Sequence, residues 1–139
     1  MSKPFKVLKI EHIGIAVENI FEASNFFQLL GLDSSNLEKI ESEGVKVIKF
    51  CTKDKSHKIE LLEGLDTFSP ISKFIKNKGE GVHHIALEVD DISKAIDFLK
   101  QNNIKLVYEN VKRGANNKLI NFIHPNSCPG ILLEICQQK

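Results

Sequence analysis

Two histidines and two glutamates stand out in this sequence because their spacing suits a shared metal site. His12 and His84 begin the similar segments HIGIAV and HIALEV, and each is followed by a glutamate inside an apolar run, at Glu60 and Glu134. The two histidine-to-glutamate separations are nearly equal. Because an unpaired charge inside a buried strand is costly, the four residues together predict a divalent-metal site of imidazole nitrogens and carboxylate oxygens.

Each of these residues also has an interpretation without a metal. A lone histidine at such a position is more often a core residue with a partner, and Glu60 and Glu134 could be edge-strand residues that face solvent. Two histidines at matching places favour the metal site. Its mixed donors suit an octahedral ion, so we expect Co²⁺ or Mn²⁺, with Ni²⁺, Fe²⁺ or Zn²⁺ as alternatives. An all-oxygen calcium site does not fit.

The positions match because the sequence contains an internal repeat. Residues 12–28 align without gaps to residues 84–100, and the identities are His12/His84, Ile13/Ile85, Val17/Val89, Ile20/Ile92, Ala23/Ala95 and Phe26/Phe98. The repeat is too long for a solenoid unit, and only two copies fit in 139 residues. We therefore interpret the chain as a duplicated half-domain.

Each copy is predicted to form a strand, a helix and further strands. The first strand covers residues 8–17, and a helix follows the predicted N-cap Asn19 until Gly31 ends it. Asp91 is the corresponding cap in the second copy. Further strands are expected at 45–52, 57–63, 105–109, 119–124 and 130–137, and a short linker helix at 70–78. Helical spacing places Ile20, Ala23, Phe27 and Leu30 on the buried stripe of the first helix.

These elements predict an α+β fold with one domain over residues 1–139. Two tandem βαβββ modules, at about 8–66 and 82–137, form a shared concave sheet in this interpretation. Side chains alternate along a strand, so each histidine shares its face with small or polar residues, and the large apolar residues occupy the other face. Because a helix is expected to cover the apolar face, the histidines should face a cavity.

Composition excludes several classes of function. Nineteen basic and eighteen acidic residues give a formal net charge of +1, so no broad electrostatic surface for nucleic acid is expected. No apolar run approaches the roughly 20 residues that span a bilayer, and the N-terminal residues lack a signal-peptide pattern. Three cysteines without a CxxC pair indicate reduced thiols. We expect a cytoplasmic protein, or a mitochondrial matrix protein if a eukaryotic presequence has been removed.

Several longer motifs resemble a known family. The segments EHIGIAV (11–17), IELL (59–62), GEGVHHIA (79–86) and NFIHP (121–125) are similar to those of methylmalonyl-CoA epimerases over about residues 8–137. GEGVHHIA and the F-x-H-P pattern are the specific ones. These enzymes are members of the vicinal-oxygen-chelate superfamily, which includes glyoxalase I, bleomycin resistance proteins and extradiol dioxygenases. Its fold consists of repeated βαβββ modules.

The resemblance implies a set of roles for individual residues. His12, His84 and Glu134 would be metal ligands, and Glu60 would be a fourth at a position where relatives have Gln or Glu. The implied reaction interconverts (2R)- and (2S)-methylmalonyl-CoA by removing and returning the C2 proton through a metal-stabilised enolate. Glu134 is expected to be one proton-transfer group. Some relatives carry a glutamate as the second proton-transfer group at the position of Val47. Valine cannot transfer a proton.

The loop from Lys112 to Lys118 is expected to meet the acyl-CoA substrate. Arg113 and Lys118 could bind its carboxylate or phosphate groups, or could be exposed loop charges without a ligand. The resemblance also implies a homodimer. Two alternative functions remain open: a glyoxalase I-like lyase or isomerase acting on another substrate with vicinal oxygens, and a non-catalytic module that binds a ligand without a metal.

Overall fold

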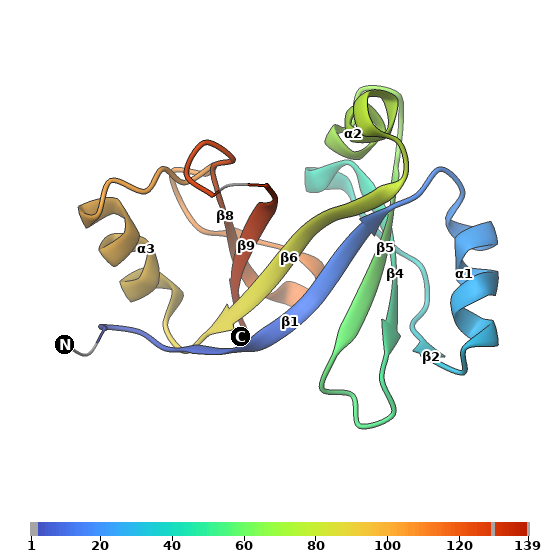
Figure 1. Ribbon diagram of the computed structural model, residues 1–139, viewed down its shortest axis with the longest axis horizontal. Coiled ribbons are helices and arrows are strands. Elements are labelled where there is room, and N and C mark those ends of the chain that lie inside the picture. Colours follow the sequence, from blue (N-terminus) through green and yellow to red (C-terminus); the bar gives the residue numbers. More distant parts are fainter. Residues whose placement is uncertain (1–2, 129, 139) are drawn as a thin grey trace. The chain divides into compact units, whose positions relative to one another are not determined.

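The computed structural model describes residues 3–128 and 130–138, which form two compact units. The central unit is residues 12–83, and the terminal unit combines residues 3–11 with the described residues from 84 onward. Strands β1 (Val7–Ala16) and β6 (Gly81–Val89) each cross from one unit to the other (Figure 1). Both units combine a mixed sheet with helices, which confirms the predicted α+β class.

The central unit contains the first copy of the repeat and the helix that follows it. Its elements after β1 are α1 (Ile20–Leu29), β2 (Asp33–Ser34), β3 (Glu38–Ile40), the 3₁₀ turn η1 (Glu41–Glu43), β4 (Val45–Cys51), β5 (Lys58–Gly64) and α2 (Pro70–Lys78). The strand order is β2-β4-β5-β1, and β3 also pairs with β4. β1 runs parallel to β5, whereas β2, β3 and β5 are each antiparallel to β4.

Helices α1 and α2 pack on opposite faces of the central sheet. The α1 side contains a buried apolar cluster of Val17, Ile20, Ile48, Phe50 and Leu61. The α2 side contains Ala16, Val45, Val47, Leu62 and Ile71. A Cβ at Gly64 would overlap the hydroxyl groups of Ser69 and Ser72, so glycine allows α2 to approach β5 this closely. The helix at 70–78 is therefore part of the central core as well as a connection.

The terminal unit contains the second copy and repeats the same pattern. Its elements after β6 are α3 (Ile92–Gln101), β7 (Lys112–Arg113), the 3₁₀ turn η2 (Ala115–Asn117), β8 (Leu119–Ile123) and β9 (Leu132–Gln137). The strand order is β6-β9-β8-β7, with β6 and β9 parallel and the others antiparallel. Helix α3 packs through Ile92, Ala95 and Ile96 on the face that carries Val89 and Ile135.

Both predicted helix caps are present. The side chain of Asn19 accepts hydrogen bonds from the backbone N–H groups of Phe21 and Glu22, each at 3.1 Å. Asp91 accepts one from the N–H of Lys94 at 3.0 Å. These bonds satisfy N–H groups that have no partner within the helix. The buried stripe of α1 is shorter than expected, because Leu30 follows the helix and is 62% exposed.

The strand predicted at 105–109 is wrong. In this segment only Leu106 forms an isolated bridge, to Ile123. The side chain of Asn121 instead binds the backbone of Tyr108 twice, accepting from its N–H and donating to its carbonyl oxygen, both at 3.1 Å. At Tyr108 a buried side chain therefore takes the place of a partner strand, whereas Lys105 and Val107 keep backbone hydrogen bonds to His124 and Phe122. No helix among the described residues is long and apolar enough to cross a bilayer.

Candidate metal centre

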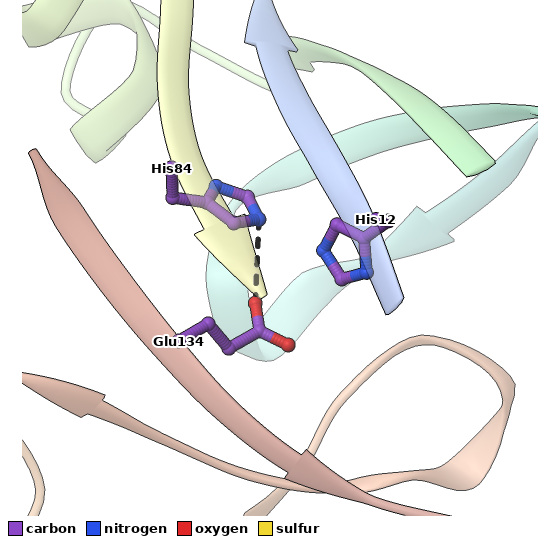
Figure 2. A group of neighbouring side chains, drawn as sticks. All are labelled: His12, His84 and Glu134. Carbon is purple, nitrogen blue, oxygen red and sulfur yellow. Dashed lines mark ion pairs between the residues drawn. The ribbon is translucent and has the colours of Figure 1, made fainter. Parts of the chain in front are cut away.

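The terminal unit brings His84 and Glu134 together. His84 lies on β6 and Glu134 on β9, and Nε2 of the imidazole is 3.3 Å from Oε1 of the carboxylate (Figure 2). Each residue is only 5% exposed. The ring of Phe122 meets the His84 ring edge to face, with 5.8 Å between the ring centres. The imidazole is thus held between a carboxylate and an aromatic ring.

The central unit brings His12 and Glu60 together in the same way. His12 lies on β1, where Figure 2 also draws it, and Glu60 lies on β5. Nδ1 of His12 is 3.3 Å from Oε2 of Glu60, and both residues are buried. The alternative that Glu60 and Glu134 face solvent at a sheet edge is therefore wrong.

The strand register makes the two pairs equivalent. Glu60 pairs with Gly14 across β5 and β1, and Glu134 pairs with Ala86 across β9 and β6. Each glutamate thus lies opposite the residue two positions after its histidine. Because paired residues project from the same face and alternate residues share a face, each histidine and glutamate project together. The register explains why a repeat in the sequence reproduces a pair of side chains in space.

The two pairs differ in the imidazole nitrogen that meets the carboxylate. His84 uses Nε2, whereas His12 uses Nδ1. When a carboxylate holds Nδ1 of a histidine, the ring orientation and tautomer are set so that Nε2 suits a metal. Glu60 is therefore placed to orient His12 as well as to offer an oxygen donor. Imidazole and carboxylate groups that are buried in such pairs fit a divalent transition ion with mixed nitrogen and oxygen ligands.

A buried lysine shares a face of the central sheet with this pair. Lys49 lies on β4 directly opposite Glu60 and is only 5% exposed. The sequence analysis did not single out this residue. The signal is visible in the segment VKVIKFC (45–51), where alternation puts Lys49 on the face of two valines and Lys46 on the other face.

Val47 lies two residues before Lys49 on β4 and projects from the same face. It is buried in the cluster under α2 and pairs across the sheet with Leu62. The position that carries a glutamate in some relatives is therefore part of an apolar core here. Glu41 and Glu43, the acidic residues nearest to it in the sequence, lie on η1 before the strand begins. Neither of them belongs to the strand face that carries Val47 and Lys49.

Lys118 is not an exposed loop charge. Its ammonium donates a hydrogen bond to Oε1 of Glu11 at 2.6 Å, and both side chains are almost completely buried. Glu11 is a second residue that the sequence analysis missed. Its pairing is hard to foresee because 107 residues separate the two partners. A role for Lys118 in contacting substrate stays a prediction.

Arg113 is exposed on the surface of the loop. Its Nη1 donates to the carbonyl oxygen of Asn117 at 3.2 Å and to the side-chain oxygen of the same residue at 3.1 Å. Asn116 and Asn117 both have positive φ angles, of 54° and 62°. Asparagine tolerates this left-handed backbone better than most residues, and glycine tolerates it freely. The asparagines therefore preserve a loop shape that glycine commonly supports.

The remaining histidines have structural surroundings. His83 meets the Phe74 ring edge to face at 5.0 Å between ring centres. His124 accepts a hydrogen bond from the backbone N–H of Asn126 at its Nδ1. His57 is exposed beside the turn between β4 and β5. These three residues are outside the two histidine–glutamate pairs.

Cys136 borders the terminal pair on β9. It is fully buried. Burial raises the pKa of its thiol to about 12, and the negative charge of Glu134 adds to this shift. A thiol with such a pKa is neutral at physiological pH. Cys136 packs with Ala86 and Ile120 in a buried cluster of the terminal unit.

Comparisons with known proteins agree with this geometry. The sequence profile of the Glyoxalase/Bleomycin resistance protein/Dioxygenase superfamily matches residues 11–122. The mitochondrial methylmalonyl-CoA epimerase of Homo sapiens is 39% identical over 131 residues, which are 93% of this chain and 73% of the human protein.

Solved structures give the same result. The crystal structure of methylmalonyl-CoA epimerase from Mycobacterium tuberculosis has a TM-score of 0.93 at 30% identity, covering 100% of this chain and 93% of that one. A methylmalonyl-CoA epimerase in complex with methylmalonyl-CoA and NH4+ has a TM-score of 0.89 at 28% identity, covering 96% of each chain. The chain therefore belongs to the methylmalonyl-CoA epimerase family, within the glyoxalase/bleomycin resistance protein/dioxygenase superfamily.

Proposed function

We propose that this chain interconverts (2R)- and (2S)-methylmalonyl-CoA. The observation that carries the proposal is the pair of equivalent histidine–glutamate contacts, one in each unit, in a chain of the epimerase family. A member of this family has been solved with methylmalonyl-CoA bound. The substrate suits the reaction, because the C2 hydrogen lies between a thioester and a carboxylate and is therefore unusually acidic.

His12, His84, Glu134 and Glu60 would hold one divalent ion, for which Co²⁺ or Mn²⁺ is the best candidate. The support for this set is that all four residues are buried, chemically suited to such an ion and arranged as matching pairs. A bound ion would act as a Lewis acid on the substrate oxygens and stabilise the negative charge that develops when C2 loses its proton.

Glu134 would transfer a proton at one face of C2. A carboxylate that is buried beside an imidazole has the right chemistry for a general base. Epimerisation requires a second donor or acceptor on the opposite face, and Val47 cannot be that group. Arg113 is exposed on the loop from Lys112 to Lys118, and we assign it to the phosphate or carboxylate groups of the acyl-CoA.

We also propose that the chain is a cytoplasmic homodimer. The first part of β1 exposes Leu8 and Ile10, which share one face of the strand and are each more than half exposed. Apolar side chains that cluster on a surface favour a protein partner. A second copy of the chain would cover them, and the mass of the protein in solution tests this proposal.

The test of function is exchange at C2 of the substrate. Protein stripped with a chelator and then reloaded with Co²⁺ should exchange the C2 proton of methylmalonyl-CoA for deuterium, and the stripped protein should not. The hemithioacetal of methylglyoxal and glutathione serves as the comparison substrate. If loaded protein fails to exchange the C2 proton, or turns over only the hemithioacetal, the proposed function is wrong.

A further inference from the structure

The buried lysine of β4 has no role in the reaction described so far. Lys49 lies between Ile48 and Phe50 in an apolar strand, and its ammonium nitrogen is buried. Removing an ammonium group from water is costly unless a charge or a bound ligand compensates for it. A methionine or leucine would pack in a strand of this kind without that cost. Lysine at this position therefore adds a charge that packing of the strand alone does not require.

The register of the sheet places Lys49 on the face of the candidate site. Lys49 pairs with Glu60, which in turn pairs with Gly14 two positions after His12. Paired residues project from the same face, so the ammonium stands beside the His12–Glu60 contact. Gly14 adds no side chain to the row of paired residues that it forms with Lys49 and Glu60. Lys46, three residues earlier on β4, projects from the opposite face and contacts Glu63 at 3.0 Å.

The same face becomes apolar one row farther along. Val47, Leu62 and Ala16 form the next row of paired residues, and Ile71 of α2 packs against them. A cationic group thus lies next to the apolar core under α2 on one sheet face. The reacting end of methylmalonyl-CoA combines the same two features, because C2 carries a methyl group and a carboxylate.

We infer that Lys49 binds the free carboxylate of the substrate and selects malonyl-type thioesters over thioesters that lack this group. The inference rests on the proposed function and concerns the specificity of the same site. Glu60, opposite Lys49, supplies the negative charge that accompanies the ammonium in the protein without substrate. Lys49 is a binding residue in this account, and its contribution is its positive charge.

The test compares two thioesters that differ in the carboxylate. The Kd values of methylmalonyl-CoA and propionyl-CoA are measured with wild-type protein and with Lys49→Met, in saturating Co²⁺ so that metal occupancy stays constant. The charge of Lys49 should make the Kd of methylmalonyl-CoA about ten- to hundredfold lower. Lys49→Met should therefore raise that Kd by this factor and change the Kd of propionyl-CoA less than threefold.

Matched variants separate charge from structure. Lys49→Arg keeps the charge and should retain most of the preference for methylmalonyl-CoA over propionyl-CoA. Lys46→Met removes a lysine from the opposite face of the same strand and should retain all of this preference. If Lys49→Met does not fold, Lys49→Gln makes the same comparison. The inference is overturned if the neutral variant keeps the wild-type preference, or if both Kd values rise by the same factor. Deuterium exchange by the wild-type protein tests the proposed function separately.

Discussion

The carboxylate of Glu11 lies 2.6 Å from the ammonium of Lys118, and the two side chains are 0% and 2% exposed. The pair joins the loop before β8 to β1 within the terminal unit. Two opposite charges in such a place stabilise each other, because removing one leaves the other buried without this contact.

Replacing Lys118 with methionine should therefore destabilise the protein strongly. We expect a loss of about 3–5 kcal/mol in the free energy of unfolding, since Glu11 would keep its charge without its partner. Urea unfolding followed by circular dichroism measures this loss. The double variant Glu11→Leu/Lys118→Met should recover most of it, because neither charge of the pair remains. Lys46→Met, which breaks the partly exposed contact with Glu63, should cost about 1 kcal/mol or less. A small loss in Lys118→Met would contradict this account.

The candidate ligands should differ in their effects on metal affinity. Loss of His84 or Glu134, as His84→Ala or Glu134→Ala, should lower the affinity for Co²⁺ at least about a hundredfold, because a ligand is lost. Glu60→Ala should lower it about 10- to 100-fold, the usual cost of losing a carboxylate that orients a metal-binding histidine.

Titration calorimetry with Co²⁺ measures these affinities, and Glu60→Gln tests whether an oxygen at this position is sufficient. His57→Ala is the control, because His57 is exposed and outside both pairs. Unchanged Co²⁺ binding in Glu134→Ala would exclude the proposed ligand set.

Cys136 should be the least reactive of the three cysteines. With a pKa of about 12 it stays a neutral thiol at pH 8, whereas Cys51 and Cys128 are only partly buried. Iodoacetamide at pH 8 should alkylate Cys51 and Cys128 in native protein and reach Cys136 only after unfolding, as mass spectrometry of the peptides would show.

The raised pKa also predicts a pH dependence of stability. The ordinary thiol pKa is 9.0, so between about pH 9 and 12 the unfolded chain loses this proton while the folded chain retains it. The contribution of Cys136 is therefore complete below pH 9 and is lost as the pH rises. The free energy of unfolding, measured with urea at pH 8 and at pH 10, should fall less between these two pH values for Cys136→Ala than for wild-type protein. An equal loss in both would be evidence against the shift.

The histidine–glutamate pairs could be predicted because they depend on local rules. The repeat identified equivalent positions, and the alternation of strand side chains indicated which residues share a face. Helix α2 begins at Pro70 as predicted, with Ser69 accepting a hydrogen bond from the N–H of Ser72. Proline at the first helical position and serine before it are signals that can be read without a structure.

The remaining features depend on partners that are distant in the sequence. Lys118 looked like a loop charge because nothing near it indicates Glu11 as its partner. The segment around Tyr108 has the composition of a strand, yet the side chain of Asn121 takes its backbone hydrogen bonds. Lys49 could have been placed on its face by alternation, but only the register showed that Glu60 stands opposite.

The division of the chain into units has a consequence for its synthesis on the ribosome. Residues 12–83 are continuous, so every contact of the central unit is available once this stretch has emerged. The terminal unit combines residues 3–11 with the last part of the chain, and its strand β9 ends only at Gln137. The terminal unit therefore cannot be completed until β9 has been synthesised, so the central unit can fold before it.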